Sequence, residues 1–235
     1  MKMKVIEVFD ETPDTRTVRF DSGKDFSFKP GQFIMINADV LVDGVKKIVK
    51  RAYSISSSPL KKGYIDLTVK VYVDKGLVSR RLYNMKVGEE MEVLGPYGFF
   101  TFDENIHKSI VLIGAGSGIT PLACMLRYIQ DKNLNNIKTN LIYSSKTPED
   151  IIFNKEFIKN SHPNIKINLT ITRPEGHKWP GLIGRIDEQM IRKIIPNVKE
   201  PFYYVSGPTP MVEGTSKILK LMGVEDSKIK LERFG

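Results

Sequence analysis

A glycine-rich turn behind an apolar run constrains the fold of this chain more than any other feature. Val-Leu-Ile at residues 111–113 leads into Gly-Ala-Gly-Ser-Gly-Ile-Thr-Pro at residues 114–121, and a helix-like segment follows. Glycines let phosphates approach the backbone, and the free N–H groups at a helix start point at an anion. Proline suits the first helical turn, where its missing donor costs nothing. The pattern predicts a nucleotide pyrophosphate site, with an ordinary glycine loop as the alternative for this segment alone.

The length and composition exclude several classes of protein. With 235 residues, 41% of them hydrophobic, the chain can form one large domain or two small ones. No apolar run reaches the roughly 18 residues of a membrane span, and the N-terminus lacks the apolar core of a signal peptide. Cys124 is the only cysteine, which excludes a disulfide framework or a multi-cysteine metal site within this chain and favours a cytoplasmic location. His107, His162 and His177 lack metal-ligand spacing, so we expect surface histidines and no metal.

The chain is strongly basic. Its formal net charge is +9, and the densest source is Lys-Lys-Ile-Val-Lys-Arg at residues 46–51, followed by basic pairs at 61–62 and 80–81. Such a surface suits nucleic acid, an anionic cofactor or an acidic protein, or it is simply solvated. No zinc finger, helix-turn-helix or aromatic RNA-binding signature accompanies the charge, so we expect no nucleic acid partner.

Residues 1–103 have the pattern of short β-strands separated by turns. Apolar or alternating runs recur at 4–8, 15–20, 32–36, 64–72 and 90–94. Turn signals such as Pro30-Gly31 separate them, and Asp43-Gly44 predicts a two-residue hairpin turn. Strands so short and so numerous favour a small antiparallel β-barrel, with one helix near residues 77–83.

Residues 104–235 instead alternate strands with helices. Strands are expected at 109–113, 139–143, 166–171, 202–205 and 229–231, and helices at 121–130, 148–159, 187–194 and 208–222. This alternation predicts a Rossmann-like α/β domain with a five-stranded parallel sheet covered on both faces. Ligands of such sheets bind at the carboxyl ends of the strands, where the glycine turn lies. A polar break at residues 102–105 marks the expected boundary between domains 1–103 and 104–235.

A second constellation lies in the first half, at Arg51-Ala52-Tyr53-Ser54. Strand alternation would place Arg51 and Tyr53 on one face and Ser54 on the other. Arginine can bind a diphosphate, tyrosine can cover a flat ring, and serine can donate to a ring nitrogen. A plain strand with a surface arginine and a packed tyrosine explains the same residues. The Gly-Leu-Val-Ser segment at 76–79 predicts a second anion site at a helix start.

The order and spacing of these motifs resemble the ferredoxin–NADP reductase family of flavoproteins over essentially the whole chain. The resemblance rests on Arg-x-Tyr-Ser at 51–54, Gly-x-x-Ser at 76–79, Gly-Pro-x-Gly at 95–98 and the glycine-rich turn at 114–118. It implies an FAD-binding antiparallel barrel followed by an NAD(P)-binding α/β domain. It also implies an enzyme that passes a hydride between nicotinamide C4 and flavin N5.

The resemblance assigns roles to residues of the barrel. Arg51 would hold the FAD diphosphate, Tyr53 would pack on the flavin, and Ser54 would form a hydrogen bond near N5. Backbone donors at 76–79 would bind the diphosphate, which favours FAD over FMN. The implied FAD-binding residues are Arg51, Ala52, Tyr53, Ser54, Val69, Lys70, Gly76, Leu77, Val78 and Ser79.

The resemblance also assigns roles in the second half. The glycine turn would receive the dinucleotide, with Thr120 near the nicotinamide. The implied dinucleotide-binding residues are Gly114, Gly116, Gly118, Thr120, Pro121, Gly207 and Pro208. Ser206 stands where the family has a cysteine beside the nicotinamide, so hydride-transfer rates are expected to differ. Phe234 would shield the flavin and Glu232 would relay protons, or the segment is a frayed tail. Ser54, Ser206, Glu232 and Phe234 are thus the catalytic candidates.

Three basic residues bear on the choice of coenzyme. Lys146, Arg173 and Arg185 follow strands or turns where NADPH-preferring relatives place cations for the 2′-phosphate. They favour NADPH over NADH. Surface roles for them remain open, and Gly-Arg at 184–185 also occurs in relatives that use NADH.

The acceptor is the least determined part of the reaction. Without a cysteine cluster for an iron–sulfur centre, electrons are expected to leave to a separate protein. An acidic ferredoxin or flavodoxin suits the basic surface. The alternatives are a reductase subunit of a multi-component oxygenase or other complex, and a basic binding module that has lost its flavin.

Overall fold

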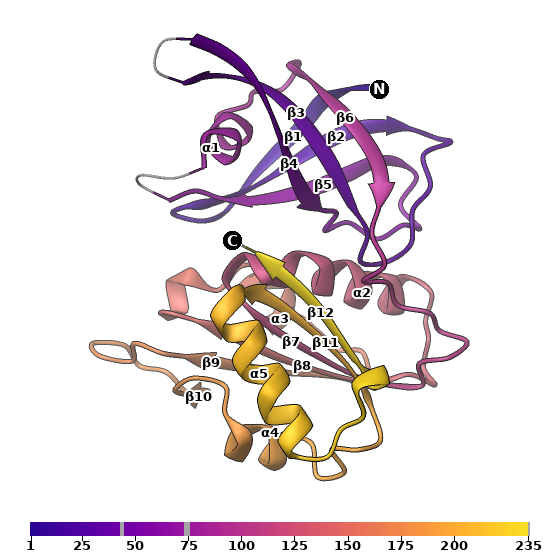
Figure 1. Cartoon of the computed structure of the whole chain (residues 1–235), viewed down its shortest axis with the longest axis vertical. Helices are drawn as coiled ribbons and strands as arrows, with labels where there is room; N and C mark the ends of the chain where they lie inside the picture. The colour runs from indigo at the N-terminus through magenta and orange to yellow at the C-terminus, as the bar shows by residue number, and fades with distance from the viewer. Residues whose placement is uncertain (43–44, 73–75, 235) are drawn as a thin grey trace. The chain divides into compact units, whose positions relative to one another are not determined.

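The computed structural model describes residues 1–42, 45–72 and 76–234 (Figure 1). Its contacts form two compact units, one of Met1–Thr101 with Ala123–Asp131, and one of Phe102–Leu122 with Lys132–Gly235. The predicted turn at Asp43-Gly44 and the final Gly235 lie outside the described residues. The helices of the described residues are too short or too polar to span a lipid bilayer.

The first unit is the predicted antiparallel barrel. Its strands are β1 (Lys2–Thr12), β2 (Thr15–Gly23), β3 (Phe33–Val42), β4 (Val45–Ser54), β5 (Gly63–Lys70) and β6 (Glu90–Tyr97). They form one sheet in the order β4-β3-β6-β1-β2-β5, and every pairing is antiparallel. An isolated bridge between Ile55 and Leu67 joins the chain beyond β4 to the opposite edge strand, so the sheet curls toward closure.

Alternation along the strands builds the barrel core. Ile34 and Ile36 of β3 and Ile65 and Leu67 of β5 are fully buried, as residues two apart on one strand face must be. Helix α1 (Leu77–Tyr83) covers this core with Val78 and Leu82. Burying one such side chain contributes about 1.5–3 kcal/mol, so the apolar face of α1 fixes the helix to the barrel.

The β3–β4 hairpin extends farther than the apolar pattern predicted. Strand β4 begins at Val45, and its first six residues are mostly exposed. Strand β3 pairs with β6 only from Phe33 to Asn37, so the remaining residues of β3 and β4 form a two-stranded ribbon. The start of β4 is lysine-rich and does not alternate between apolar and polar residues, so the sequence gives no signal for a strand there. It is a strand because its backbone pairs with β3, not because one of its faces is buried.

The second unit is a parallel α/β sheet, as predicted. Its strands are β7 (Ser109–Ala115), β8 (Lys138–Ser145), β9 (Ile165–Ile171), β10 (Leu182–Ile183), β11 (Phe202–Pro208) and β12 (Ile229–Phe234), in the order β10-β9-β8-β7-β11-β12. The sheet therefore has a sixth strand, β10, beyond the five expected. Strand β10 has only two residues, which lie between Gly181 and Gly184, and these are too few to show the alternation of apolar and polar residues that marks a strand.

Helices cover the sheet of the second unit. They are α2 (Ile119–Asp131), α3 (Asn154–Ile158), α4 (Glu188–Ile194) and α5 (Thr209–Leu221), with 3-10 turns at Gly116–Gly118, Pro148–Asp150 and Asp226–Lys228. Helices α4 and α5 lie on one face (Figure 1), where Ile191 and Leu219 pack with Ile113 and Val205. Within helix α2, the first turn belongs to the sheet unit and residues 123–131 to the barrel unit.

Two expectations for this unit were wrong. The helix expected over 148–159 is a 3-10 turn followed by the short α3, because Ile151, Ile152 and Phe153 are all buried and Phe153 adopts a left-handed conformation. His107, expected at the surface, is buried, and its ring meets Phe202 edge to face at 4.3 Å. Its Nδ1 accepts a hydrogen bond from the amide of Asp103, which satisfies a nitrogen that burial would otherwise leave unpaired.

Candidate functional site

The order of the parallel strands locates a binding edge. From β7 the chain proceeds to β8 and β9 on one side and returns to β11 on the other side. The strand order therefore reverses between β7 and β11, and ligands of open α/β sheets bind outside the carboxyl ends of the strands at such a switch point. The glycine turn follows β7, and Ser206-Gly207-Pro208 ends β11, so both motifs lie at this edge.

Glycine is required at the turn because β11 passes directly beside it. A Cβ atom on Gly118 would lie 2.2 Å from the Ser206 carbonyl oxygen, and one on Gly114 would lie 2.9 Å from Leu122 Cδ1. The Thr120 hydroxyl donates to the Ser117 carbonyl at 3.0 Å, which ties the first turn of α2 to the loop. The close approach leaves backbone rather than side chains lining the turn, as a phosphate site needs.

Three of the catalytic candidates lie on neighbouring strands. Ser206 is paired with Gly114 of β7 and with Glu232 of β12, and Phe234 is paired with Pro208. The Ser206 hydroxyl is fully buried and has no hydrogen-bond partner among the described residues. The final residues are thus a strand rather than a frayed tail.

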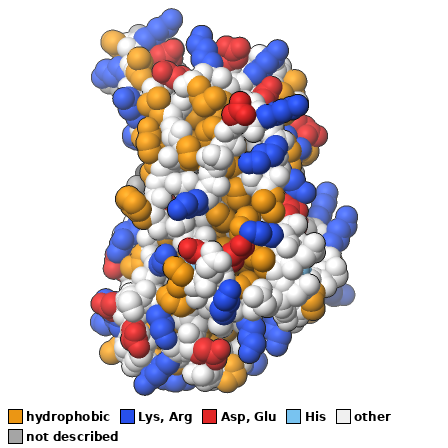
Figure 2. All heavy atoms as spheres, turned by 90° about the vertical axis from the view of Figure 1, so that its right-hand side faces the viewer, with side chains coloured by type: hydrophobic (Ala, Val, Ile, Leu, Met, Phe, Trp, Pro, Cys, Tyr) orange, Lys and Arg blue, Asp and Glu red, His pale blue; other side chains and the backbone are white. Residues whose placement is uncertain are grey.

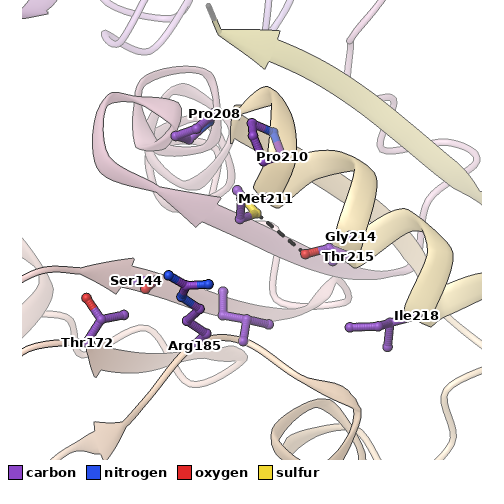
Figure 3. A pocket seen from close by; sticks show the side chains of 10 residues that line it. Ser144, Thr172, Arg185, Pro208, Pro210, Met211, Gly214, Thr215 and Ile218 are labelled. Atoms are coloured by element: carbon purple, nitrogen blue, oxygen red, sulfur yellow. Dashed lines mark hydrogen bonds between the residues drawn. The ribbon is translucent and has the colours of Figure 1, made fainter.

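A cavity of about 430 Å³ opens at the same edge of the sheet unit (Figure 3). Figure 3 shows the Arg185 side chain beside Ser144, with Met211 of α5 on the opposite wall. Lys146 and Arg173 follow β8 and β9, and the Arg173 amide donates to the Lys146 carbonyl at 2.8 Å. The structure therefore brings Lys146 and Arg173 together and places Arg185 in the cavity wall.

Sequence reasoning missed the uncharged part of this wall. Ser144 is the second-last residue of strand β8 and Thr172 directly follows β9, and both line the cavity with Met211 and Thr215 of α5. A search for hydroxyl residues at the predicted strand ends would have found Ser144 and Thr172. The α5 residues have no such signal, because only the packing of α5 beside the sheet brings them there.

The barrel unit assembles the other motif residues. Arg51 and Tyr53 are paired with Ile36 and Ile34 of β3 and share one strand face, as predicted. The Tyr53 hydroxyl lies 2.9 Å from Ser79 Oγ on α1. Burial raises the pKa of Tyr53, although the hydrogen bond with Ser79 and the charge of Arg51 oppose that shift. Tyr53 therefore presents a neutral ring that α1 holds in place.

The remaining barrel candidates differ in their surroundings. Ser54 is 7% exposed, and Gly76 adopts the left-handed conformation that begins α1, which glycine tolerates without strain. Arg51 is exposed and donates to the Lys50 carbonyl at 2.8 Å. Lys70 is different, because its ammonium is paired with Asp14 at 2.7 Å. Any contribution of Lys70 to cofactor binding is therefore expected from its backbone.

Comparisons with known proteins decide the family. The sequence model of the oxidoreductase FAD-binding domain matches residues 2–102, and that of the oxidoreductase NAD-binding domain matches residues 112–217. NADH-cytochrome b5 reductase 1 of Dictyostelium discoideum is 31% identical over 234 residues, which cover 97% of this chain and 80% of that protein. The chain belongs to the ferredoxin–NADP reductase family of flavoproteins.

Two further family members agree with this assignment. The glycine betaine monooxygenase reductase subunit of Chromohalobacter salexigens is 34% identical over 240 residues, covering 99% of this chain and 64% of that protein. The chain thus spans slightly less than two thirds of that relative's length. The cytochrome b5 reductase domain of Ulva prolifera nitrate reductase has the same fold, with a TM-score of 0.88, 26% identity, and coverage of 98% and 96% of the two chains.

The residues present fit the two cofactors of this reductase family. In the barrel unit, an exposed guanidinium at Arg51 adjoins an aromatic ring at Tyr53, which suits a diphosphate and a flat ring system. In the sheet unit, the turn at Gly118 offers backbone where a Cβ atom would collide. The Ser206 hydroxyl beside this turn is fully buried and has no hydrogen-bond partner within the described part of the chain.

Proposed function

We propose that this chain is an FAD-dependent NAD(P)H reductase that passes electrons to a separate acidic electron carrier. One observation supports the proposal most strongly: a single chain carries both the Arg51–Tyr53–Ser79 arrangement and a glycine turn at the switch point of a parallel sheet. We assign FAD to residues 1–103 and the nicotinamide coenzyme to residues 104–235. A single buried cysteine suits a reducing, cytoplasmic setting.

The protein's part in the reaction is to bind and orient. When bound, the cofactors supply hydride transfer between nicotinamide C4 and flavin N5 and the release of single electrons. Arg51 and the backbone at 76–79 would bind the FAD diphosphate, while Tyr53 would pack on the flavin. Ser54 would donate a hydrogen bond near N5. The turn at 114–118 would bind the coenzyme diphosphate through backbone N–H groups.

Ser206, Glu232 and Phe234 would act at the nicotinamide end. Their strand pairing supports this assignment, because it places all three at one edge of the sheet. The Ser206 hydroxyl would form a hydrogen bond with the nicotinamide. Phe234 would exclude water, and Glu232 would hold a proton for exchange with solvent.

Basic residues at the cavity support a preference for NADPH. A 2′-phosphate needs arginine or lysine within hydrogen-bond reach, and Lys146 and Arg173 are joined through their backbones beside the wall that holds Arg185. We expect Arg173→Ala to raise the Michaelis constant for NADPH at least tenfold more than that for NADH. Equal increases for the two coenzymes would reject this assignment.

The charge distribution supports an acidic partner. On the face shown in Figure 2, lysine and arginine side chains are spread among acidic and apolar ones. The β3–β4 ribbon instead carries three exposed lysines close together in the sequence, Lys46, Lys47 and Lys50. Complementary charge speeds encounter and weakens with salt. Reduction of an acidic ferredoxin or flavodoxin should therefore slow as ionic strength rises, and a rate independent of salt would count against electrostatic steering.

A reductase subunit of a multi-component oxygenase is the second candidate. The name of the Chromohalobacter relative favours it. The two candidates differ in the acceptor, because a subunit would transfer electrons rapidly only to its own oxygenase component. Turnover with a panel of acidic ferredoxins, flavodoxins and oxygenase components separates them.

The first experiment is to examine the purified protein for bound flavin. Bound FAD gives a yellow protein with an absorption band at about 450 nm. Addition of NADPH without oxygen should bleach that band. A colourless protein that does not take up added FAD would overturn the proposal and favour a binding module.

A further inference from the structure

Residues 123–131 of helix α2 belong to the barrel unit and contact its other segments through one face. Cys124, Arg127 and Asp131 are spaced by three and four residues, so they lie on the same side of the helix. The Asp131 carboxylate pairs with Lys61 at 3.1 Å, and a Cβ atom on Gly31 would lie 2.6 Å from Met125 Cε. Residues 123–131 of α2 are therefore closely packed on the segments of the barrel unit that precede β3 and β5.

Arg127 contacts the segment that directly follows the Arg51–Ser54 motif. Its Nη1 donates to the Ser56 carbonyl at 2.7 Å, and Ser56 is fully buried two residues beyond Ser54. A charged donor makes a stronger hydrogen bond than a neutral one. Because the Ser56 carbonyl is in the backbone, this contact restrains the path of the chain rather than one side chain.

The segment around Ser56 is otherwise held by neutral hydrogen bonds. The Ile55 amide donates to the Gln32 carbonyl at 3.0 Å, and the Ser56 amide donates to the Asp66 carbonyl at 2.9 Å. The Ser56 hydroxyl lies 2.9 Å from Thr68 Oγ1. These bonds come from strand β5 and from Gln32 just before β3, whereas Arg127 comes from helix α2.

We infer that Arg127 is a positioning residue, which fixes the backbone of residues 54–56 so that the Ser54 hydroxyl keeps its orientation. The inference rests on the proposed function, because it assumes that Ser54 acts at the flavin. Catalysis tolerates little misplacement, since an error of about 1 Å can lower a rate on the order of a hundredfold. Loss of the Arg127 contact should therefore affect hydride transfer more than coenzyme affinity.

The test compares Arg127→Gln and Arg127→Lys with Lys61→Met, which removes the ion pair between Lys61 and Asp131 of α2. In the FAD-loaded protein, single-turnover reduction by saturating NADPH should slow at least tenfold in Arg127→Gln and at least threefold in Arg127→Lys. The dissociation constant of NADP⁺ should stay within twofold. Lys61→Met should leave both quantities within twofold of the wild type.

Amide hydrogen exchange of the protein without FAD gives a readout that does not depend on activity. The amides of Ile55 and Ser56 should exchange at least tenfold faster in Arg127→Gln, while that of Val5, which donates to the Glu89 carbonyl on another part of the barrel, should stay within twofold. An equal rise at all three amides would mean general destabilisation and would overturn the inference.

The experiments distinguish failure of the proposed reductase function from failure of the role inferred for Arg127. If the wild type takes up no FAD, the proposed function fails, and the exchange experiment still decides the role of Arg127. If Arg127→Gln does not fold, Arg127→Lys carries both measurements, and wild-type values in that variant overturn the inference.

Discussion

Replacement of Gly118 by alanine is the sharpest perturbation that the site offers. The new Cβ atom would lie 2.2 Å from the Ser206 carbonyl oxygen and 2.5 Å from the Gly207 Cα atom. Both are backbone atoms of β11, so neither can rotate away, and the turn must separate from the strand by about 1 Å. Overpacking costs about 1–3 kcal/mol where side chains can adjust, and we expect about 3 kcal/mol here, roughly a hundredfold in the folded-to-unfolded ratio.

Urea unfolding followed by circular dichroism measures the stability loss, and titration with NADP⁺ measures the loss of binding, which should be at least tenfold. Gly214→Ala is the matched control for the stability measurement alone, because Gly214 also lines the cavity at the coenzyme site. Gly214 lies inside α5, and a Cβ atom there would meet nothing within 4 Å. Alanine should therefore stabilise the helix by about 0.5–1 kcal/mol. Wild-type stability and NADP⁺ affinity in Gly118→Ala would refute the close approach of the turn to β11.

Two further predictions concern buried polar groups. Ser206→Ala removes a buried hydroxyl without a partner among the described residues, so the free energy of unfolding of the coenzyme-free protein should rise by about 1–2 kcal/mol, and a fall would show that the hydroxyl is paired. Burial and the charge of Lys230 hold the pKa of His107 below 6.5, although Asp103 opposes the shift. As the pH falls, His107 is protonated in the unfolded chain before it is protonated in the folded protein. The free energy of unfolding should therefore be highest above about pH 6.5 and should fall as the pH drops through the pKa of the folded state. In urea unfolding at pH 8 and pH 5, His107→Gln should lose less stability than the wild type, and equal losses would contradict the role of His107.

Local patterns predicted the parts of the fold that depend on periodicity. Alternation predicted the barrel, and the alternation of apolar strands with helices predicted the parallel sheet, because both patterns record which face of each element is buried. The glycine turn was predictable for another reason. Strand β11 leaves no room for a Cβ atom at Gly118, so the structure needs glycine there, and that glycine is visible in the sequence.

The rest depends on contacts between segments far apart in the sequence. The sixth strand, β10, exists only because Leu182 and Ile183 pair with β9. His107 is buried because Phe202 and Tyr204 of β11 surround it. The contact of Arg127 with Ser56 joins residues 71 positions apart. Neither composition nor spacing carries a signal for these contacts.

Anaerobic stopped-flow mixing of the FAD-loaded protein with NADPH, and separately with NADH, tests the central claim most directly. We predict complete bleaching of the flavin band with both coenzymes, in proportion to bound FAD. At low coenzyme concentration, bleaching should be faster with NADPH than with NADH. A protein that holds a full complement of FAD and is bleached by neither coenzyme would contradict it.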